Sequence, residues 1–346
     1  MRAQQILIAI VLLLTCSTQT RAQDISTEGI LKRNLERNEE RNFLSLSVEN
    51  DNLASDTDQF YTSGVRLTYF NAGTDAPEVL DFIDTYNPLF DINETTSTFF
   101  TLGHNIYTPQ DITVSALQEN DRPWAAFLYG SIGLATTSKN HIDEIELTLG
   151  VVGPEALGEP IQKFVHEHIS SSPEPEGWDN QIDFEPGVIL SWQRRWPNAY
   201  AIDFGDFRLA AEPNVNVSLG NIYTYAGTGL MFSFGPYQGY LQDKPPRVRP
   251  ALPGSGYFET PDQGWSWYVF AGADGRAVAR NIFLDGNTFS DSHSVDKNYF
   301  VGDLTGGLAF TLGDYRLAYS LNYRTEEFKN QDDASTFGSL TLSTRF

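Results

Sequence analysis

The chain has 346 residues, of which 45 are acidic and 23 are basic, and its formal net charge is −22. Nucleic-acid binding needs clustered Lys and Arg to neutralise phosphates, so this balance argues against nucleic acid as a partner. After residue 22, no apolar run approaches the roughly 20 residues of a membrane-spanning helix, which excludes a helical membrane protein.

Residues 1–22 are predicted to be a secretory signal peptide and not part of the fold. An apolar run from Ile6 to Leu14 precedes a small-residue cleavage site that ends at Ala22. Cys16 lies inside this segment, so the mature chain is expected to lack disulfides and thiolate metal sites. The strongly charged segment 23–42 is predicted to be a solvated periplasmic lead-in, with a plug or a partner-binding helix as the alternative.

Short segments with strict alternation of apolar and polar residues recur along the rest of the chain, most clearly from Tyr315 to Arg324. One apolar and one polar face over segments of about ten residues is typical of an outer-membrane β-barrel. A soluble β-sandwich gives similar alternation and is the alternative. Aromatic residues near strand ends and a final strand that closes on Phe346 favour the barrel.

We therefore expect an all-β fold in which residues 43–346 form a transmembrane, antiparallel, up-and-down β-barrel in the bacterial outer membrane. About twelve strands are expected, at 43–49, 63–71, 98–106, 124–136, 141–152, 181–196, 199–219, 223–235, 265–285, 299–312, 315–325 and 336–346. If both termini are periplasmic, the connections after the first, third and fifth strands lie at the outer rim. Two periplasmic connections, 72–97 and 236–264, are long, so they either carry local structure or mark an error in the strand count.

An oxygen-rich segment, Glu49 to Gly64, follows the first expected strand. Carboxylate, amide and hydroxyl oxygens suit a hard cation such as Ca²⁺, so Asp51 and Asn50 are predicted to be metal ligands, with Thr62 close by. The simpler alternative is that Asn50 and Asp51 only close the strand end through Asx-turns and that Thr62 is an ordinary strand residue.

The connection after the fifth expected strand predicts a short helix in an extracellular loop. Pro160 suits the first turn of a helix, and the apolar residues that follow it give one apolar face. Gln162 and His166 are four residues apart and project from one side, whereas His168 lies on another side. Strand parity puts this pair at the same rim as Asp51. The alternative is a His that is merely solvated.

These residue types support ester hydrolysis. His166 suits a general base that takes a proton from water, and a cation on Asp51 would polarise the ester carbonyl. Asn50, Thr62 or Gln162 would orient the water or donate to the oxyanion. The chain has no Gly-x-Ser-x-Gly motif, so no serine nucleophile is evident.

At these residues the sequence resembles the outer-membrane lipid A 3′-O-deacylase family. The matching motifs follow one another along the mature chain, at 49–51, 61–64, 106–109, 122–124, 162–166, 177–181, 220–227 and 279–286. The resemblance implies a calcium-dependent esterase that removes the 3′-linked acyloxyacyl group of lipid A in lipopolysaccharide. It also implies that the catalytic residues are Asn50, Asp51, Thr62, Gln162 and His166.

Two further family residues have no firm match in this chain. The family's lysine falls near Tyr107, where the sequence offers His104 and Asn105, and Glu174 and Glu176 compete for its glutamate. We expect the protein to act as a monomer. The alternatives are an outer-membrane phospholipase with the same calcium and His apparatus, and a non-catalytic barrel such as a porin or an adhesin.

Overall fold

The computed structural model describes residues 42–54, 60–72, 90–93, 95–170, 172–197, 199–237, 243–248 and 256–346. The expected signal peptide and all but the last residue of the charged lead-in lie outside this part of the chain. No helix within the described ranges is long and apolar enough to cross a membrane.

The described residues form thirteen strands and a few short helices. The strands are β1 Asn42–Asn50, β2 Phe60–Asn71, β3 Ser97–Thr108, β4 Ala125–Thr137, β5 Ile142–Val152, β6 Glu185–Arg195, β7 Tyr200–Phe204, β8 Phe207–Gly220, β9 Tyr223–Pro236, β10 Trp265–Asn281, β11 Phe300–Leu312, β12 Tyr315–Arg324 and β13 Ser335–Arg345. The helices are η1 Asp51–Leu53, η3 Pro154–Ala156, α4 Gly158–His168, η4 Trp178–Asn180 and α5 Ile282–Asp285.

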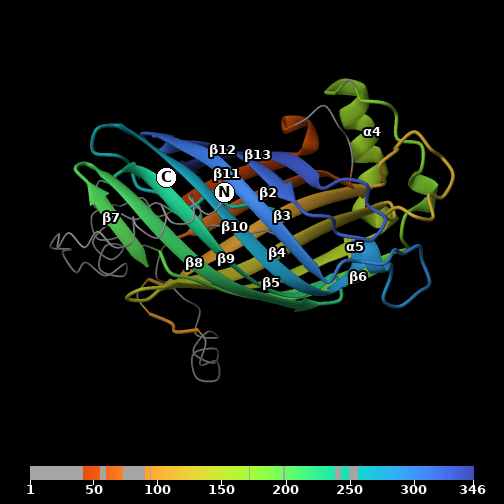
Figure 1. The fold of residues 1–346 in the computed structure, drawn as a ribbon, viewed down its shortest axis with the longest axis horizontal. Helices are drawn as coiled ribbons and strands as arrows, with labels where there is room; N and C mark the ends of the chain where they lie inside the picture. The colour runs from red at the N-terminus through yellow and green to blue at the C-terminus, as the bar shows by residue number, and fades with distance from the viewer. Residues whose placement is uncertain are drawn as a thin grey trace, which may run out of the picture.

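Twelve of the strands close into an antiparallel barrel, as the alternation predicts (Figure 1). Strands pair with their neighbours in the chain, β1 pairs with β13, and β6 pairs directly with β8. The thirteenth strand, β7, pairs only with the first part of β8 and lies outside the closed ring. The expected strand at 199–219 is therefore wrong. It is a hairpin that turns at Gly205, whose φ of +61° suits glycine.

The expected strand at 265–285 is also too long. β10 ends at Asn281, whose side-chain Oδ1 accepts a hydrogen bond from the backbone N–H of Phe283 at 3.1 Å. This N-cap starts the short helix α5 in place of further strand.

The faces of the barrel follow the sequence alternation. In β1 the leucines Leu44 and Leu46 are exposed on the outer face, whereas Ser45, Ser47 and Glu49 are buried in the lumen. Such apolar-out, polar-in strands match a barrel wall that faces lipid.

Part of the β9–β10 connection lies in the lumen. We call its residues 243–248 and 256–260 the lumenal segment. The hydroxyl of Ser47 donates to the carbonyl of Pro246 at 2.7 Å, and Arg316 donates to the carbonyl of Asp243 at 2.7 Å. Arg195 forms a buried ion pair with Asp243. The long 236–264 connection thus carries local structure, and none of its described residues adds a strand to the barrel.

The described part of the other long connection, 72–97 between β2 and β3, also carries local structure. Phe90 is buried against Leu134, and the hydroxyl of Thr95 donates to the carbonyl of Thr137 at 2.9 Å. These contacts tie residues 90–96 to the end of β4 without adding a strand.

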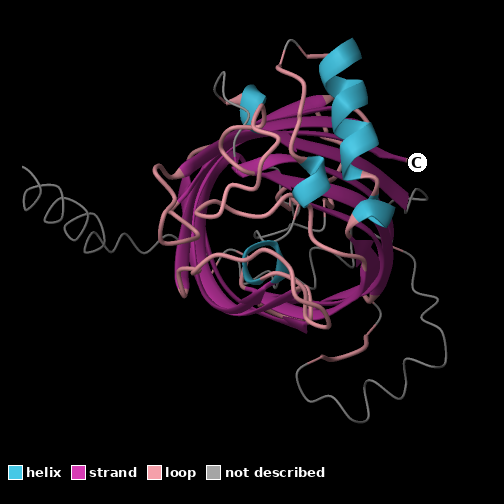
Figure 2. Cartoon of the chain, turned by 90° about the vertical axis from the view of Figure 1, so that its right-hand side faces the viewer, coloured by secondary structure: helices cyan, strands magenta, loops and turns pink. Residues whose placement is uncertain are grey.

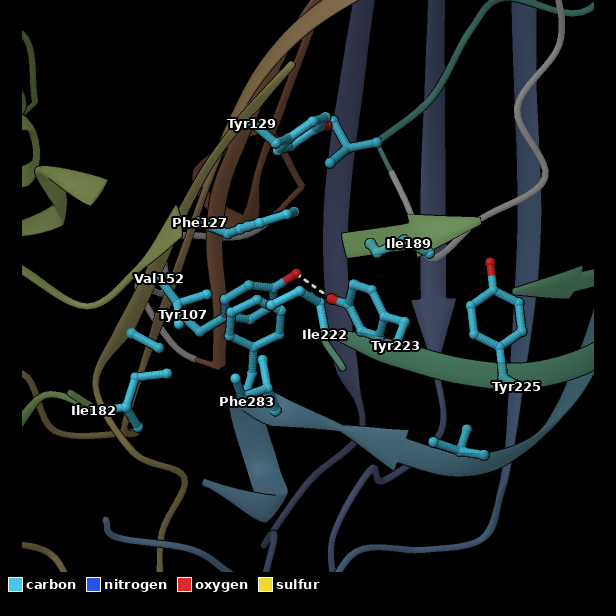
Figure 3. Close-up of a cluster of buried hydrophobic side chains, with 14 of the residues drawn as sticks. Tyr107, Phe127, Tyr129, Val152, Ile182, Ile189, Ile222, Tyr223, Tyr225 and Phe283 are labelled. Atoms are coloured by element: carbon cyan, nitrogen blue, oxygen red, sulfur yellow. Dashed lines mark hydrogen bonds between the residues drawn. The ribbon is translucent and has the colours of Figure 1, made fainter. Parts of the chain in front are cut away.

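A cluster of aromatic and aliphatic side chains fills the lumen toward α5 (Figure 3). The hydroxyls of Tyr107 and Tyr223 are 2.6 Å apart, and the ring of Phe283 stacks on Tyr107 with centroids 4.1 Å apart. A lumenal cavity next to Arg247 has a volume of about 20 Å³, which is room for about one water molecule. The described part of the lumen is therefore packed with side chains.

Candidate active site

The loop between β5 and β6 packs against the outside of the barrel. Ile106 has the same outward parity as the exposed Leu102, yet it is buried. It belongs to a cluster that joins the outer face of β3 and β4 to the loop, formed by Ile106, Ile112, Trp124, Ala126, Ala156 and Trp178. Figure 2 shows α4 at the edge of the ring of strands. The expected helix is thus present, and it lies against the wall that faces lipid.

The first residue of α4 touches this wall. A Cβ atom on Gly158 would lie only 2.6 Å from Cβ of Ala126 and would also overlap the ring of Trp178. Glycine is thus the residue that lets the helix start this close to β4.

The apolar side of α4 faces away from the wall. Ile161 and Phe164 are 39% and 56% exposed, whereas Gln162 is buried at 2% exposure. In a soluble protein the apolar side of such a helix would face the wall and the polar side would face water. Beside a membrane barrel the observed arrangement leaves the apolar residues to lipid and buries the polar Gln162.

Gln162 is held by Trp178. The indole Nε1 of Trp178 donates to Oε1 of Gln162 at 2.9 Å. Within the described residues, Nε2 of Gln162 is buried and has no hydrogen-bond partner. Trp178 belongs to the motif at 177–181 but has no predicted role, because a contact across sixteen positions of a loop leaves no spacing signal.

His166 lies one helical turn after Gln162 and is half-buried. Its Nδ1 is 2.6 Å from the carbonyl oxygen of Pro173. A carbonyl only accepts, so Nδ1 carries the hydrogen and Nε2 is the acceptor nitrogen of the neutral ring. In contrast, His168 is exposed and stacks on Phe164.

The other half of the predicted site lies where β1 ends. Asn50 is the last residue of β1 and has the outward parity of Leu44 and Leu46. Asp51 follows in η1 and is 2% exposed. The hydroxyl of Tyr319, on the outer face of β12, donates to the carbonyl of Leu53 at 2.7 Å, so η1 also folds against the outside of the wall.

Thr62 lies in β2 at an irregularity between the pairs formed by Tyr61 and Ser63. Its side chain is outside the described residues. Its predicted role therefore stays a prediction.

The two halves share one end and one face of the barrel. α4 contacts β3 and β4, whereas η1 contacts β2 and β13, and the strand order is β13-β1-β2-β3-β4. Figure 1 shows both at the end opposite the C-terminus. Strand parity thus placed both loops at the same rim, and the structure brings Gln162 and His166 together on one side of α4. The chemical roles of these residues stay predictions.

His104 lies on the outer face of β3, in the segment where the family has a lysine. Its Nε2 is 2.7 Å from the carbonyl of Ala156, so it donates to the loop just before α4. Glu174 and Glu176 are both exposed. The hydrogen bond to Glu159, together with the charges of these two carboxylates, raises the pKa of Lys163.

The oxygen donors of the β1 end are Asp51 and Asn50. Within the described ranges, no three His, Cys, Asp or Glu side chains form a group that would hold a metal ion. The chemistry of a buried carboxylate beside an amide fits a hard cation. A calcium ion would need further oxygens from backbone carbonyls, water or substrate.

A family model described as "Outer membrane protein LpxR" matches residues 6–346. The chain belongs to the LpxR family. This is the family that the motifs resemble, and it places the barrel in the bacterial outer membrane.

Two solved structures are similar to this chain. LpxR from Salmonella typhimurium is 22% identical and aligns over 88% of this chain and 100% of that chain, with a TM-score of 0.70. The beta domain of the Bordetella autotransporter BrkA is 11% identical over 89% of this chain and 99% of that chain, with a TM-score of 0.42. No curated protein sequence matches the chain. The likeness to the Salmonella structure confirms the barrel fold.

Proposed function

We propose that this LpxR-family protein is an outer-membrane esterase that removes the 3′-linked acyloxyacyl group of lipid A with a water molecule activated by His166. The observation that carries the proposal is the pair Gln162 and His166, held on one side of α4 beside the outer wall of the barrel. A lipid in the outer leaflet would approach this side of the barrel laterally.

His166 supplies the base. With the hydrogen on Nδ1 donated to Pro173, Nε2 takes a proton from water as the water oxygen attacks the ester carbonyl. When the tetrahedral intermediate collapses, the same nitrogen returns the proton to the sugar oxygen that leaves. During the attack, donors from Gln162, Asn50 or Thr62 orient the water or stabilise the oxyanion. One such donor typically raises the rate by about 10²–10³.

Asp51 and Asn50 would hold a calcium ion. When bound, the ion would polarise the ester carbonyl and neutralise nearby negative charge. That charge matters because the protein has a formal net charge of −22 and the proposed substrate is anionic.

The packed lumen supports an enzyme over a porin. Porins leave an aqueous channel, whereas this barrel is crossed by the lumenal segment and filled by the aromatic cluster. We also propose that the protein acts as a monomer.

The test is His166→Ala, with His168→Ala on the same helix as the matched control. Each variant is expressed in outer membranes, and its folding is checked by heat-modifiable migration on a gel. The masses of lipid A and of phospholipids are then measured by mass spectrometry. We expect His166→Ala to abolish loss of the 3′-linked group and His168→Ala to retain it. Full activity in folded His166→Ala would refute the proposal, and loss of acyl chains from phospholipids alone would indicate a phospholipase.

A further inference from the structure

Trp178 is a buried residue that has no role in the proposed reaction as described above. It is 2% exposed in η4 and packs against Trp124, with ring centroids 5.1 Å apart. Two glycines allow this packing, because a Cβ on Gly158 would overlap Trp178 and a Cβ on Gly177 would overlap Trp124. Packing therefore fixes the position of the indole independently of its contact with Gln162.

The contact between the two side chains sets the direction of an amide. A glutamine amide presents an acceptor oxygen on one side and a donor NH₂ group on the other, and the two ends have nearly the same shape. An indole N–H only donates, so it forms its hydrogen bond with Oε1 of Gln162 and not with Nε2, which is itself a donor. Nε2 is consequently the amide atom left for another group, and within the described residues it is buried without a partner.

We propose that Trp178 is a positioning residue that orients the Gln162 amide so that Nε2 donates to the acyl carbonyl oxygen of the ester. This inference rests on the proposed function. It also separates two roles that the sequence leaves open for Gln162. A fixed donor suits an oxygen that gains negative charge, whereas a water that is to be deprotonated needs an acceptor.

The helix then presents two complementary atoms on one side. Nε2 of Gln162 donates, and Nε2 of His166, one turn away, accepts. A donor for the carbonyl oxygen and an acceptor for the water proton are the two groups that attack of water on an ester requires.

A purely structural Trp178 is the competing interpretation, and a double-mutant cycle distinguishes the two. Trp178→Phe keeps an aromatic ring but removes the N–H. It is measured alone and in a Gln162→Ala background, as the purified full chain in detergent with lipid A as substrate. Trp124→Phe is the matched control, because it makes the same change of ring in the stacked neighbour.

We expect Gln162→Ala to lower kcat by about 100-fold, the loss typical of one oxyanion donor. Trp178→Phe should lower kcat about tenfold with KM within about twofold, since the loss of one hydrogen bond shifts the orientation of the amide about tenfold away from the productive one. In the Gln162→Ala background it should have no further effect, and Trp124→Phe should stay within about twofold of wild type. Equal losses from Trp178→Phe in both backgrounds, or no loss at all, would overturn the inference.

A second measurement does not depend on activity. The ¹⁵N-labelled indole signals are recorded by NMR, and the Trp178 signal is assigned by its absence in Trp178→Phe. It should shift in Gln162→Ala and stay in place in Lys163→Ala, which alters the next, solvent-facing position. If wild type fails to hydrolyse lipid A, the proposed function fails while this signal still reports the hydrogen bond. A Trp178 signal that ignores Gln162→Ala would refute the orienting contact itself.

Discussion

Arg247 in the lumenal segment donates from Nε to Oε1 of Glu49 at 3.1 Å, and Glu49 is the residue directly before Asn50. The backbone N–H of Val248 donates to the same carboxylate oxygen at 3.2 Å. The connection between β9 and β10 therefore supports, from inside the barrel, the strand end that carries Asn50 and Asp51 on the outside.

Removing this cation should weaken the barrel at the site. Arg247→Met removes this cation from the buried carboxylate of Glu49, and breaking a buried ion pair by removing one member costs about 3–5 kcal/mol in the free energy of unfolding. Urea unfolding in lipid vesicles measures the effect. Arg208→Met, which breaks the more exposed pair with Asp203, is the control and should cost at most about 1 kcal/mol. Equal stability of the two variants would contradict this support.

Replacing both partners should reverse much of that loss. Glu49→Met combined with Arg247→Met removes the buried charge as well as the cation, and such exchanges are often neutral. We expect the double variant to unfold at a higher urea concentration than Arg247→Met alone. A double variant that is less stable than both single variants would argue against a simple ion pair.

Calcium removal should stop the proposed reaction. A chelator should abolish deacylation, and added Ca²⁺ should restore it better than Mg²⁺, which demands a stricter octahedral geometry. Asp51→Asn should raise the Ca²⁺ concentration needed for half-maximal activity at least tenfold, whereas Asp332→Asn, an exposed acidic residue, should not. Unchanged activity in the chelator would remove calcium from the proposal.

The start of α4 should tolerate no side chain. Gly158→Ala forces a methyl group onto Ala126 and Trp178, so the helix and His166 must move. A displacement of about 1 Å can cost about 100-fold in rate, and we expect a loss of at least tenfold in kcat. Gly306→Ala, which meets no atom within 4 Å, is the control. Wild-type kcat in Gly158→Ala would show that helix position matters little.

The sequence predicted the barrel well because strands that face lipid on one side and a polar core on the other must alternate. It also placed Asp51 and His166 at one rim, since strand parity alone decides which connections share an end. The hairpin at Gly205 was missed because β7 and β8 continue one run of strand-forming residues across a short turn.

Other features depend on contacts between residues far apart in the sequence. Arg247 contacts Glu49, which is 198 positions away in the sequence, and no local pattern predicts a segment that folds into the lumen. The outward apolar face of α4 is the reverse of the arrangement in a soluble protein, as expected of a helix beside a membrane barrel. The contact of Trp178 with Gln162 likewise depends on how the loop folds.

Phe164 on α4 and Leu102 on β3 are apolar and exposed, as expected of side chains beside lipid. An enzyme that opens sideways into a leaflet meets its substrate by lateral diffusion in two dimensions. For the proposed reaction, the quantity that sets the rate is then the mole fraction of lipid A in the surface. Adding inert detergent at a fixed bulk concentration of lipid A should slow the enzyme by surface dilution alone.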